Sequence, residues 1–121
     1  MYTLLVENNK SALFATRELL VSYGHRVDAA TSPNEALAKA RLKNYDLVIL
    51  DLDLPDESSM KLLTKLGRSI PFLPVFGLID EMSITKVMRA IKMSAIDVFK
   101  KPLTLKDIIF MQHQVTETIL V

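Results

Sequence analysis

Acidic, amide and lysine side chains stand directly after short apolar runs of the sequence. These polar residues are Glu7, Asn8, Asp51, Asp53 and Lys101. Carboxylate and amide oxygens suit a hard divalent cation, and a lysine suits a phosphate oxygen. If the apolar runs are neighbouring parallel strands, the residue types predict one site for a cation and a phosphate group.

Each of these side chains, taken singly, also has an ordinary structural explanation. An Asp that closes a strand, as Asp51 would, is commonly a turn or cap residue. An acid such as Glu7 commonly lies in solvent or near a helix N-terminus, and most lysines, Lys101 included, are expected on the surface. The functional interpretation therefore depends on all three residues reaching the same edge of one sheet.

Five apolar segments are predicted to be strands. Tyr2 to Val6 and Leu47 to Leu50 are continuous apolar runs, as expected for central strands covered by helices on both faces. The other predicted strands are His25 to Ala30, Phe72 to Leu78 with Pro74 near its start, and Asp97 to Phe99.

A helical pattern follows each predicted strand. Gly24 and Gly67 are predicted to end the first and third helices. The second helix should begin at Ser32, with Pro at its first position and Glu35 three residues after the cap. The fourth helix, 84–91, is the clearest amphipathic one, and the last, 105–120, has the capping pair Thr104 and Asp107.

Strands that alternate with helices predict an α/β fold with a parallel sheet and helices on both faces. In such open sheets the site lies at the carboxyl ends of the strands, where the strand order reverses. With 121 residues, the chain has the usual size of a single domain. We therefore expect one domain over residues 1–121, with no output domain within them.

Composition excludes several classes of function. The absence of cysteine excludes disulfides, thiolate metal sites and thiol nucleophiles. The 15 Lys and Arg residues are balanced by 14 Asp and Glu and are scattered, so the basic footprint of a nucleic-acid binder is missing. No apolar stretch approaches the length of a membrane span and no basic leader opens the chain, so we expect a cytoplasmic protein.

Four strings of the sequence form a specific signature: Leu4 to Asn8, Glu35 to Leu37, Asp46 to Pro55, and Lys101 to Leu103. Through them the chain resembles the receiver domain of bacterial two-component response regulators over essentially its whole length. The resemblance implies a flavodoxin-like, three-layer sandwich of five βα units with strand order 2-1-3-4-5.

The same resemblance implies a phosphoryl-transfer role. Asp51 would attack the phosphorus of a phosphohistidine on a histidine kinase or phosphotransfer protein and form an acyl phosphate. Lys101 would pair with the phosphoryl group, and Mg²⁺ would neutralise its oxygens. Glu7, Asn8, Asp51 and the backbone carbonyl of Asp53 would hold the metal.

The sequence departs from the family at several positions. Asn8 replaces the second acid that usually follows the first strand, so Mg²⁺ should bind more weakly. Ile79 stands where a switch hydroxyl is usual and Val98 where a switch aromatic is usual, so the two-state element biased by phosphate is altered. Phe99 should point to the face opposite Val98. Ser94 replaces a usual glycine.

Two functions remain open, and a third is disfavoured. The first is an Asp51 phospho-acceptor with non-standard switching, which Asp51, Lys101 and Pro102 favour. The second is a phosphorylation-independent module that binds other proteins, which Asn8 and the altered switch favour. The third is a small flavin-binding domain, which the absence of a Ser, Thr and Gly-rich loop after the first strand disfavours.

Helix 84–91, strand 97–99 and helix 105–120 form the surface that receivers commonly use for dimerisation or for an output domain. We expect a homodimer or output contact there. The sequence leaves open whether the chain is a stand-alone receiver or a piece of a longer regulator. His25 and His113 are both expected to be surface residues.

Overall fold

The computed structural model describes the backbone of residues 1–120 and the side chains of residues 1–117. Five parallel strands form one sheet of order β2-β1-β3-β4-β5, which confirms the predicted fold class and strand order. The elements are β1 (Tyr2–Val6), α1 (Lys10–Ser22), β2 (Arg26–Ala30), α2 (Pro33–Leu42), β3 (Leu47–Asp51), α3 (Ser58–Ser69), β4 (Val75–Ile79), α4 (Ile84–Lys92), β5 (Asp97–Lys100) and α5 (Leu105–Leu120).

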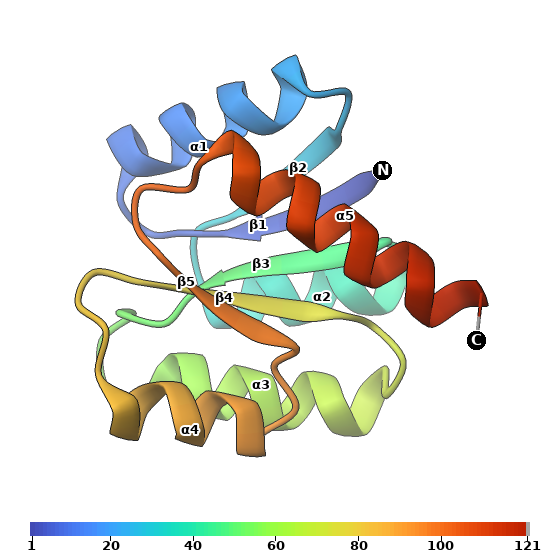
Figure 1. Ribbon diagram of the computed structural model, residues 1–121. Helices are drawn as coiled ribbons and strands as arrows, with labels where there is room; N and C mark the ends of the chain where they lie inside the picture. Colours follow the sequence, from blue (N-terminus) through green and yellow to red (C-terminus); the bar gives the residue numbers. More distant parts are fainter. Residues whose placement is uncertain (121) are drawn as a thin grey trace.

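The sheet separates two hydrophobic cores. Helices α1 and α5 cover one face, and α2, α3 and α4 cover the other (Figure 1). Side chains of β1 alternate between the cores: Leu4 and Val6 pack toward α2 and α3, and Leu5 packs toward α1 and α5. Because β1 and β3 are buried on both faces, their sequences are continuous apolar runs.

Capping residues begin and end helices as predicted. Ser32 Oγ accepts the Glu35 N–H at 3.2 Å, and Thr104 and Asp107 exchange side-chain bonds to each other's backbone N–H at 2.9 and 3.2 Å. Gly24 follows α1 with a φ of +91°, a conformation that favours glycine.

Two element boundaries differ from the sequence prediction by more than one residue. β4 begins at Val75 rather than Phe72, and the Phe72 side chain is 93% exposed. Pro74 ends the preceding loop, because it has no N–H to donate to a neighbouring strand. α3 does not end at Gly67 but continues to Ser69. Gly67 has a helical backbone, and no other atom lies close to the position that a side chain would take there.

The apolar stripe of α4 is not a buried face. Ile84 is 80% exposed and Met88 60% exposed, and Ala90 is the buried residue of this helix. Val87 packs against the core from a partly buried position. The periodicity predicted the helix correctly, but most of the stripe faces outward.

His25 is buried, which contradicts its predicted surface position. Its ring nitrogens lie 2.7 Å from Thr3 Oγ1 and 2.6 Å from Gln112 Oε1. β2 begins one residue later than predicted, at Arg26. His113 is exposed as predicted.

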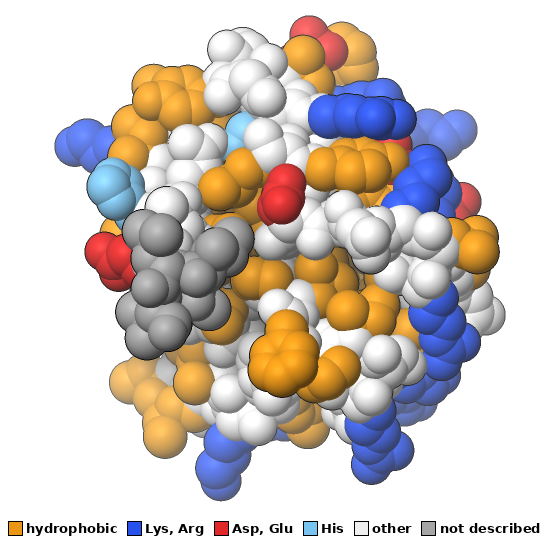
Figure 2. All heavy atoms as spheres, turned by 90° about the vertical axis from the view of Figure 1, so that its right-hand side faces the viewer, with side chains coloured by type: hydrophobic (Ala, Val, Ile, Leu, Met, Phe, Trp, Pro, Cys, Tyr) orange, Lys and Arg blue, Asp and Glu red, His pale blue; other side chains and the backbone are white. Residues whose placement is uncertain are grey.

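The two ends of the sheet differ in character. At the amino ends of the strands, hydrophobic side chains are scattered over the face, Lys and Arg lie mainly around its edge, and acidic side chains are few (Figure 2). Four acids, Glu7, Asp51, Asp53 and Asp80, gather at the opposite, carboxyl end. Within residues 1–120 no helix combines the length and apolar character needed to cross a bilayer.

Candidate functional site

The carboxyl ends of β1, β3 and β4 and the start of the loop after β5 enclose an open pocket of about 280 Å³. It is lined by Glu7, Asn8, Asn9, Ala12, Asp51, Asp53, Asp80 and Lys101. The structure therefore brings together the five polar residues singled out in the sequence. It adds Asp80, which follows β4 and is largely exposed.

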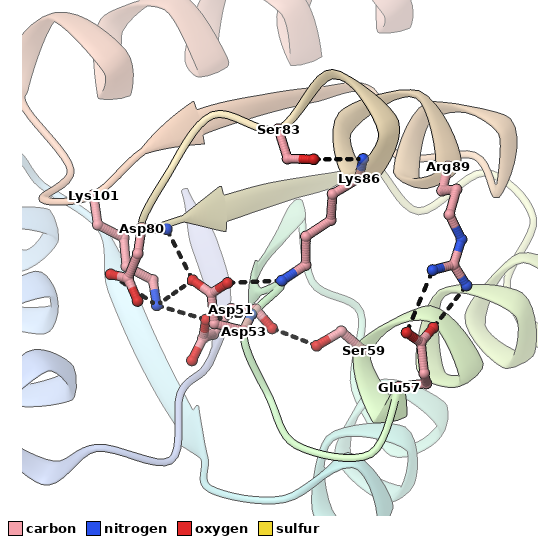
Figure 3. A network of polar contacts seen from close by, with 9 residues as sticks. All are labelled: Asp51, Asp53, Glu57, Ser59, Asp80, Ser83, Lys86, Arg89 and Lys101. Atoms are coloured by element: carbon pink, nitrogen blue, oxygen red, sulfur yellow. Dashed lines mark hydrogen bonds and ion pairs between the residues drawn. The ribbon is translucent and has the colours of Figure 1, made fainter.

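Lys101 is the central cation of the pocket. Its Nζ lies 2.6 Å from Asp51 Oδ1, 3.1 Å from Asp53 Oδ2 and 3.7 Å from Asp80 Oδ1 (Figure 3). Burial alone would lower the pKa of Lys101, but hydrogen bonds and charge from Asp51 and Asp53 raise it. The amine therefore stays charged and points at the oxygen of Asp51.

Asp51 is held rigidly although it lies at the end of a strand. It is the last residue of β3 and is only 3% exposed. Its Oδ1 accepts the Asp53 N–H at 2.8 Å, and its backbone carbonyl accepts the Ser59 hydroxyl at 2.7 Å. These bonds fix both the backbone and the carboxylate, so one carboxylate faces the pocket in a defined orientation.

Glu7 lies buried beside Asp51. Burial, followed by the hydrogen bond and the charge of Asp51, raises the pKa of Glu7 to about 8. Its Oε2 is buried and has no hydrogen-bond partner among the described side chains. Burial and the neighbouring charge of Asp51 therefore favour the protonated form of Glu7, which lowers the negative charge of the pocket.

The Asp53 side chain has a role that the sequence did not predict. Its Oδ1 accepts Lys86 Nζ at 2.8 Å, and its Oδ2 accepts the Asp80 N–H at 2.8 Å. Burial would raise the pKa of Asp53, but bonds from Lys86, Asp80 N–H and Lys101 outweigh it and lower the pKa to about 2. The only signal for Lys86 in the sequence is a lysine in the first turn of a helix, where the helix dipole disfavours a cation.

The two residues expected at altered switch positions are part of the core. Ile79 and Val98 are both buried in the cluster on the α3 side of the sheet. Phe99 packs into the opposite cluster, as the alternation of strand side chains predicted. The Lys101 N–H donates to the Ile79 carbonyl at 2.8 Å, so β4 and the loop after β5 stay joined beside the site.

The pocket suits a weakly held hard cation. Its donors are all oxygens, and the buried Glu7 Oε2 lacks a partner, which is compatible with a cation ligand. Across residues 1–120, however, no three Asp, Glu or His side chains form a metal-binding group. Asn8 is exposed, and Lys101 and Lys86 occupy oxygens of Asp51 and Asp53.

Comparison with known proteins gives consistent results. A family model described as the response regulator receiver domain matches residues 3–112. The transcriptional regulatory protein ZraR of Klebsiella oxytoca is 30% identical over 100 residues, which cover 83% of this chain and 23% of that protein. The two-component response regulator ARR18 of Arabidopsis thaliana is 32% identical over 119 residues, covering 97% of this chain and 18% of that protein.

Solved structures show the same fold. The receiver domain of NtrX from Brucella abortus superposes with a TM-score of 0.87 at 25% identity, covering 96% of this chain and 98% of that one. A receiver domain protein from Methanospirillum hungatei gives 0.86 at 23% identity, covering 96% and 94%. The chain spans about a quarter or less of the length of the two curated relatives above.

Proposed function

The chain belongs to the response regulator receiver domain family, and on that premise we propose that Asp51 accepts a phosphoryl group from a histidine kinase or phosphotransfer protein. The observation that carries the proposal is the buried Asp51 carboxylate with Lys101 Nζ at 2.6 Å in an open pocket. A charged lysine at this distance is suited to pairing with the oxygens of an incoming phosphoryl group.

The proposed transfer is a single displacement at phosphorus. An oxygen of the Asp51 carboxylate attacks the phosphorus of a phosphohistidine, and the bond from phosphorus to the imidazole nitrogen breaks. The electron pair of that bond returns to the imidazole, which takes up a proton. Lys101 offsets charge on the phosphoryl oxygens, while the Asp53 N–H holds the nucleophile in place.

A divalent cation is part of the proposal in a weakened form. When bound, Mg²⁺ neutralises the phosphoryl oxygens. Asp51, Glu7, Asn8 and the carbonyl of Asp53 are the groups that would hold it. Because Asn8 is uncharged and the pKa of Glu7 is raised, this pocket offers fewer charged ligands than two full carboxylates beside Asp51 would.

A second candidate function is a phosphorylation-independent module that binds other proteins. The buried, apolar Ile79 and Val98 favour it, because neither side chain can bond to a phosphoryl oxygen or turn inward as an aromatic. In this reading the acids of the pocket serve stability, and a partner rather than phosphate regulates the domain.

Mg²⁺ with acetyl phosphate, followed by intact mass, separates the two candidates. We expect one phosphoryl adduct on the wild-type chain and none on Asp51→Asn. Asp56→Asn is the matched control and should keep the adduct. Asp56 is an exposed acid in a loop, and asparagine tolerates the positive φ of its backbone. A wild-type chain that never acquires an adduct would leave only the second candidate.

We further propose that residues 1–121 form one receiver domain and that α4, β5 and α5 contact a second copy or an output domain. Helices α4 and α5 expose large apolar side chains that a partner would bury: Ile84, Met88, Ile91, Leu105, Ile109 and Phe110. The balanced and scattered charge argues against direct contact with nucleic acid.

A further inference from the structure

The carboxylate of Asp53 links the proposed phospho-acceptor to helix α4 through two lysines. Its Oδ2 lies 3.1 Å from Lys101 Nζ, and its Oδ1 accepts a bond from Lys86 Nζ at 2.8 Å. Lys101 in turn contacts Asp51 at 2.6 Å. Figure 3 shows this series of contacts, which runs from Asp51 through Lys101 and Asp53 to Lys86.

Lys86 is fixed at both of its ends. Its backbone N–H donates to the Oγ of Ser83, the N-cap of α4, at 3.3 Å. Its side chain is only about one-third exposed and ends on Asp53. A cation in the first helical turn opposes the helix dipole, so the position of Lys86 depends on the Asp53 carboxylate.

Apart from this bond, helix α4 buries few of its side chains against the domain. Ala90 is its buried residue, whereas Ile84 and Met88 are largely exposed. A second ion pair, Arg89 Nη2 with Glu57 Oε2 at 2.6 Å, ties α4 to the loop before α3. An element with so little buried apolar surface opens easily, so its ion pairs affect its local stability.

We infer that Lys86 is a positioning residue that couples the charge at Asp51 to α4, with Asp53 as the intermediary. Two lysines share the Asp53 carboxylate. A change that moves Lys101 away from Asp53 strengthens the ion pair between Asp53 and Lys86, and so holds α4 more tightly to the domain. A change that strengthens the ion pair between Lys101 and Asp53 weakens the bond from Lys86 to Asp53, and so holds α4 less tightly.

Two changes at Asp51 should therefore act on α4 in opposite directions. A phosphoryl group attracts Lys101 to its own oxygens and tightens α4. Loss of the Asp51 charge leaves Lys101 with Asp53 and loosens α4. Only the first of these rests on the proposed function. The coupling would act in place of the hydroxyl and aromatic pair that Ile79 and Val98 replace.

A mutant cycle on Asp51 and Lys86 tests the coupling without any phosphate. We expect Asp51→Asn to speed amide hydrogen exchange of α4, relative to β1 amides that report global unfolding, by about two- to fivefold, the size expected of one ion pair. In the Lys86→Met background, Asp51→Asn should leave α4 exchange unchanged. Lys92→Met, an exposed lysine at the other end of α4, should keep the wild-type effect. An equal effect of Asp51→Asn with and without Lys86 overturns the inference.

The phosphoryl half is tested with Mg²⁺ and beryllofluoride on the full chain. We expect slower exchange of α4 amides in the wild-type chain, and no such change in Lys86→Met although amides near Asp51 still shift. An α4 response that survives Lys86→Met also overturns the inference. If no amide near Asp51 responds in the wild-type chain, the proposed function fails, while the mutant cycle still decides the coupling.

Discussion

Asn8 is the pocket residue at which a negative charge is most easily introduced. It lines the pocket with Glu7 and Asp51 but brings no charge. We expect Asn8→Asp to tighten Mg²⁺ binding about tenfold, or ~1.4 kcal/mol, because a carboxylate replaces a neutral ligand. An NMR titration with Mg²⁺ measures the change. Asn34→Asp, which adds the same charge at the exposed start of α2, should bind Mg²⁺ as the wild type does. Equal tightening by both variants would assign the effect to net charge alone.

Asp28 is a charged residue outside the pocket whose hydrogen-bond partners lead to a second prediction. Its Oδ2 accepts bonds from the Tyr2 hydroxyl, from Tyr45 at 2.8 Å and from Lys43 at 3.0 Å. Burial would raise the pKa of Asp28, but these bonds lower it to about 2. A depressed pKa stabilises the fold above the unfolded value near 4, and this contribution is lost as pH falls through about 2.

Asp28→Asn should therefore lower the free energy of unfolding at pH 7 by about 1–2 kcal/mol. The difference from the wild type should shrink between pH 4 and pH 2. Urea unfolding at several pH values measures it. Glu18→Gln, on the exposed side of α1, should match the wild type throughout. A deficit in Asp28→Asn that stays constant with pH would contradict the expected protonation.

At the scale of elements, the apolar runs predicted strands well because burial on both faces leaves an unmistakable pattern. β1 has its predicted limits, and β3 extends by a single residue, Asp51. The predicted start of β4 at Phe72 was wrong, because Phe72 is apolar yet exposed. Periodicity alone does not reveal which apolar residues pack, and the stripe of α4 shows the same limit.

The site was predictable to a similar extent. Strand ends located the residues that line the pocket, because parallel strands place their carboxyl ends together. The link between Asp53 and Lys86 was not predictable, since the two residues are 33 positions apart and meet only through the placement of α4. The raised pKa of Glu7 likewise depends on burial that the sequence does not specify.

Two turn residues make a matched test of backbone strain. Ser94 follows α4 with a φ of +82°, a conformation that costs a non-glycine residue about 1 kcal/mol. Ser94→Gly should raise the free energy of unfolding by up to that amount. Gly24 has a φ of +91° and open space where a side chain would lie, so Gly24→Ala should lower stability by about 1 kcal/mol through the backbone alone. Thermal unfolding of both variants shows whether each substitution raises or lowers stability. A loss of stability in Ser94→Gly would show that the backbone of Ser94 is not strained.

At the scale of the whole molecule, His25 joins the two ends of the chain. Because Gln112 Oε1 can only accept, His25 Nε2 donates to it, and Nδ1 accepts the Thr3 hydroxyl. His25 therefore links Thr3 of β1 to Gln112 of α5, and its contact with Gln112 spans 87 positions of sequence. Burial lowers the pKa of His25, so the folded domain holds the ring neutral.

This neutral histidine predicts how the domain responds to mild acid. A lowered pKa means that the unfolded chain takes up the proton first, so the contribution of His25 to stability is present above the unfolded value near 6.5 and is lost as pH falls below it. Glu7, with its raised pKa, gains a proton in the folded domain over the same range and acts in the opposite direction, so the contribution of His25 is measured as a difference between variants. Between pH 7.5 and pH 5.5, the free energy of unfolding of the wild type in urea should fall relative to that of His25→Gln. His113→Gln should fall relative to His25→Gln by the same amount as the wild type does, because His113 is exposed. A difference between the wild type and His25→Gln that does not change with pH would show that closure of the fold does not depend on the protonation of this ring.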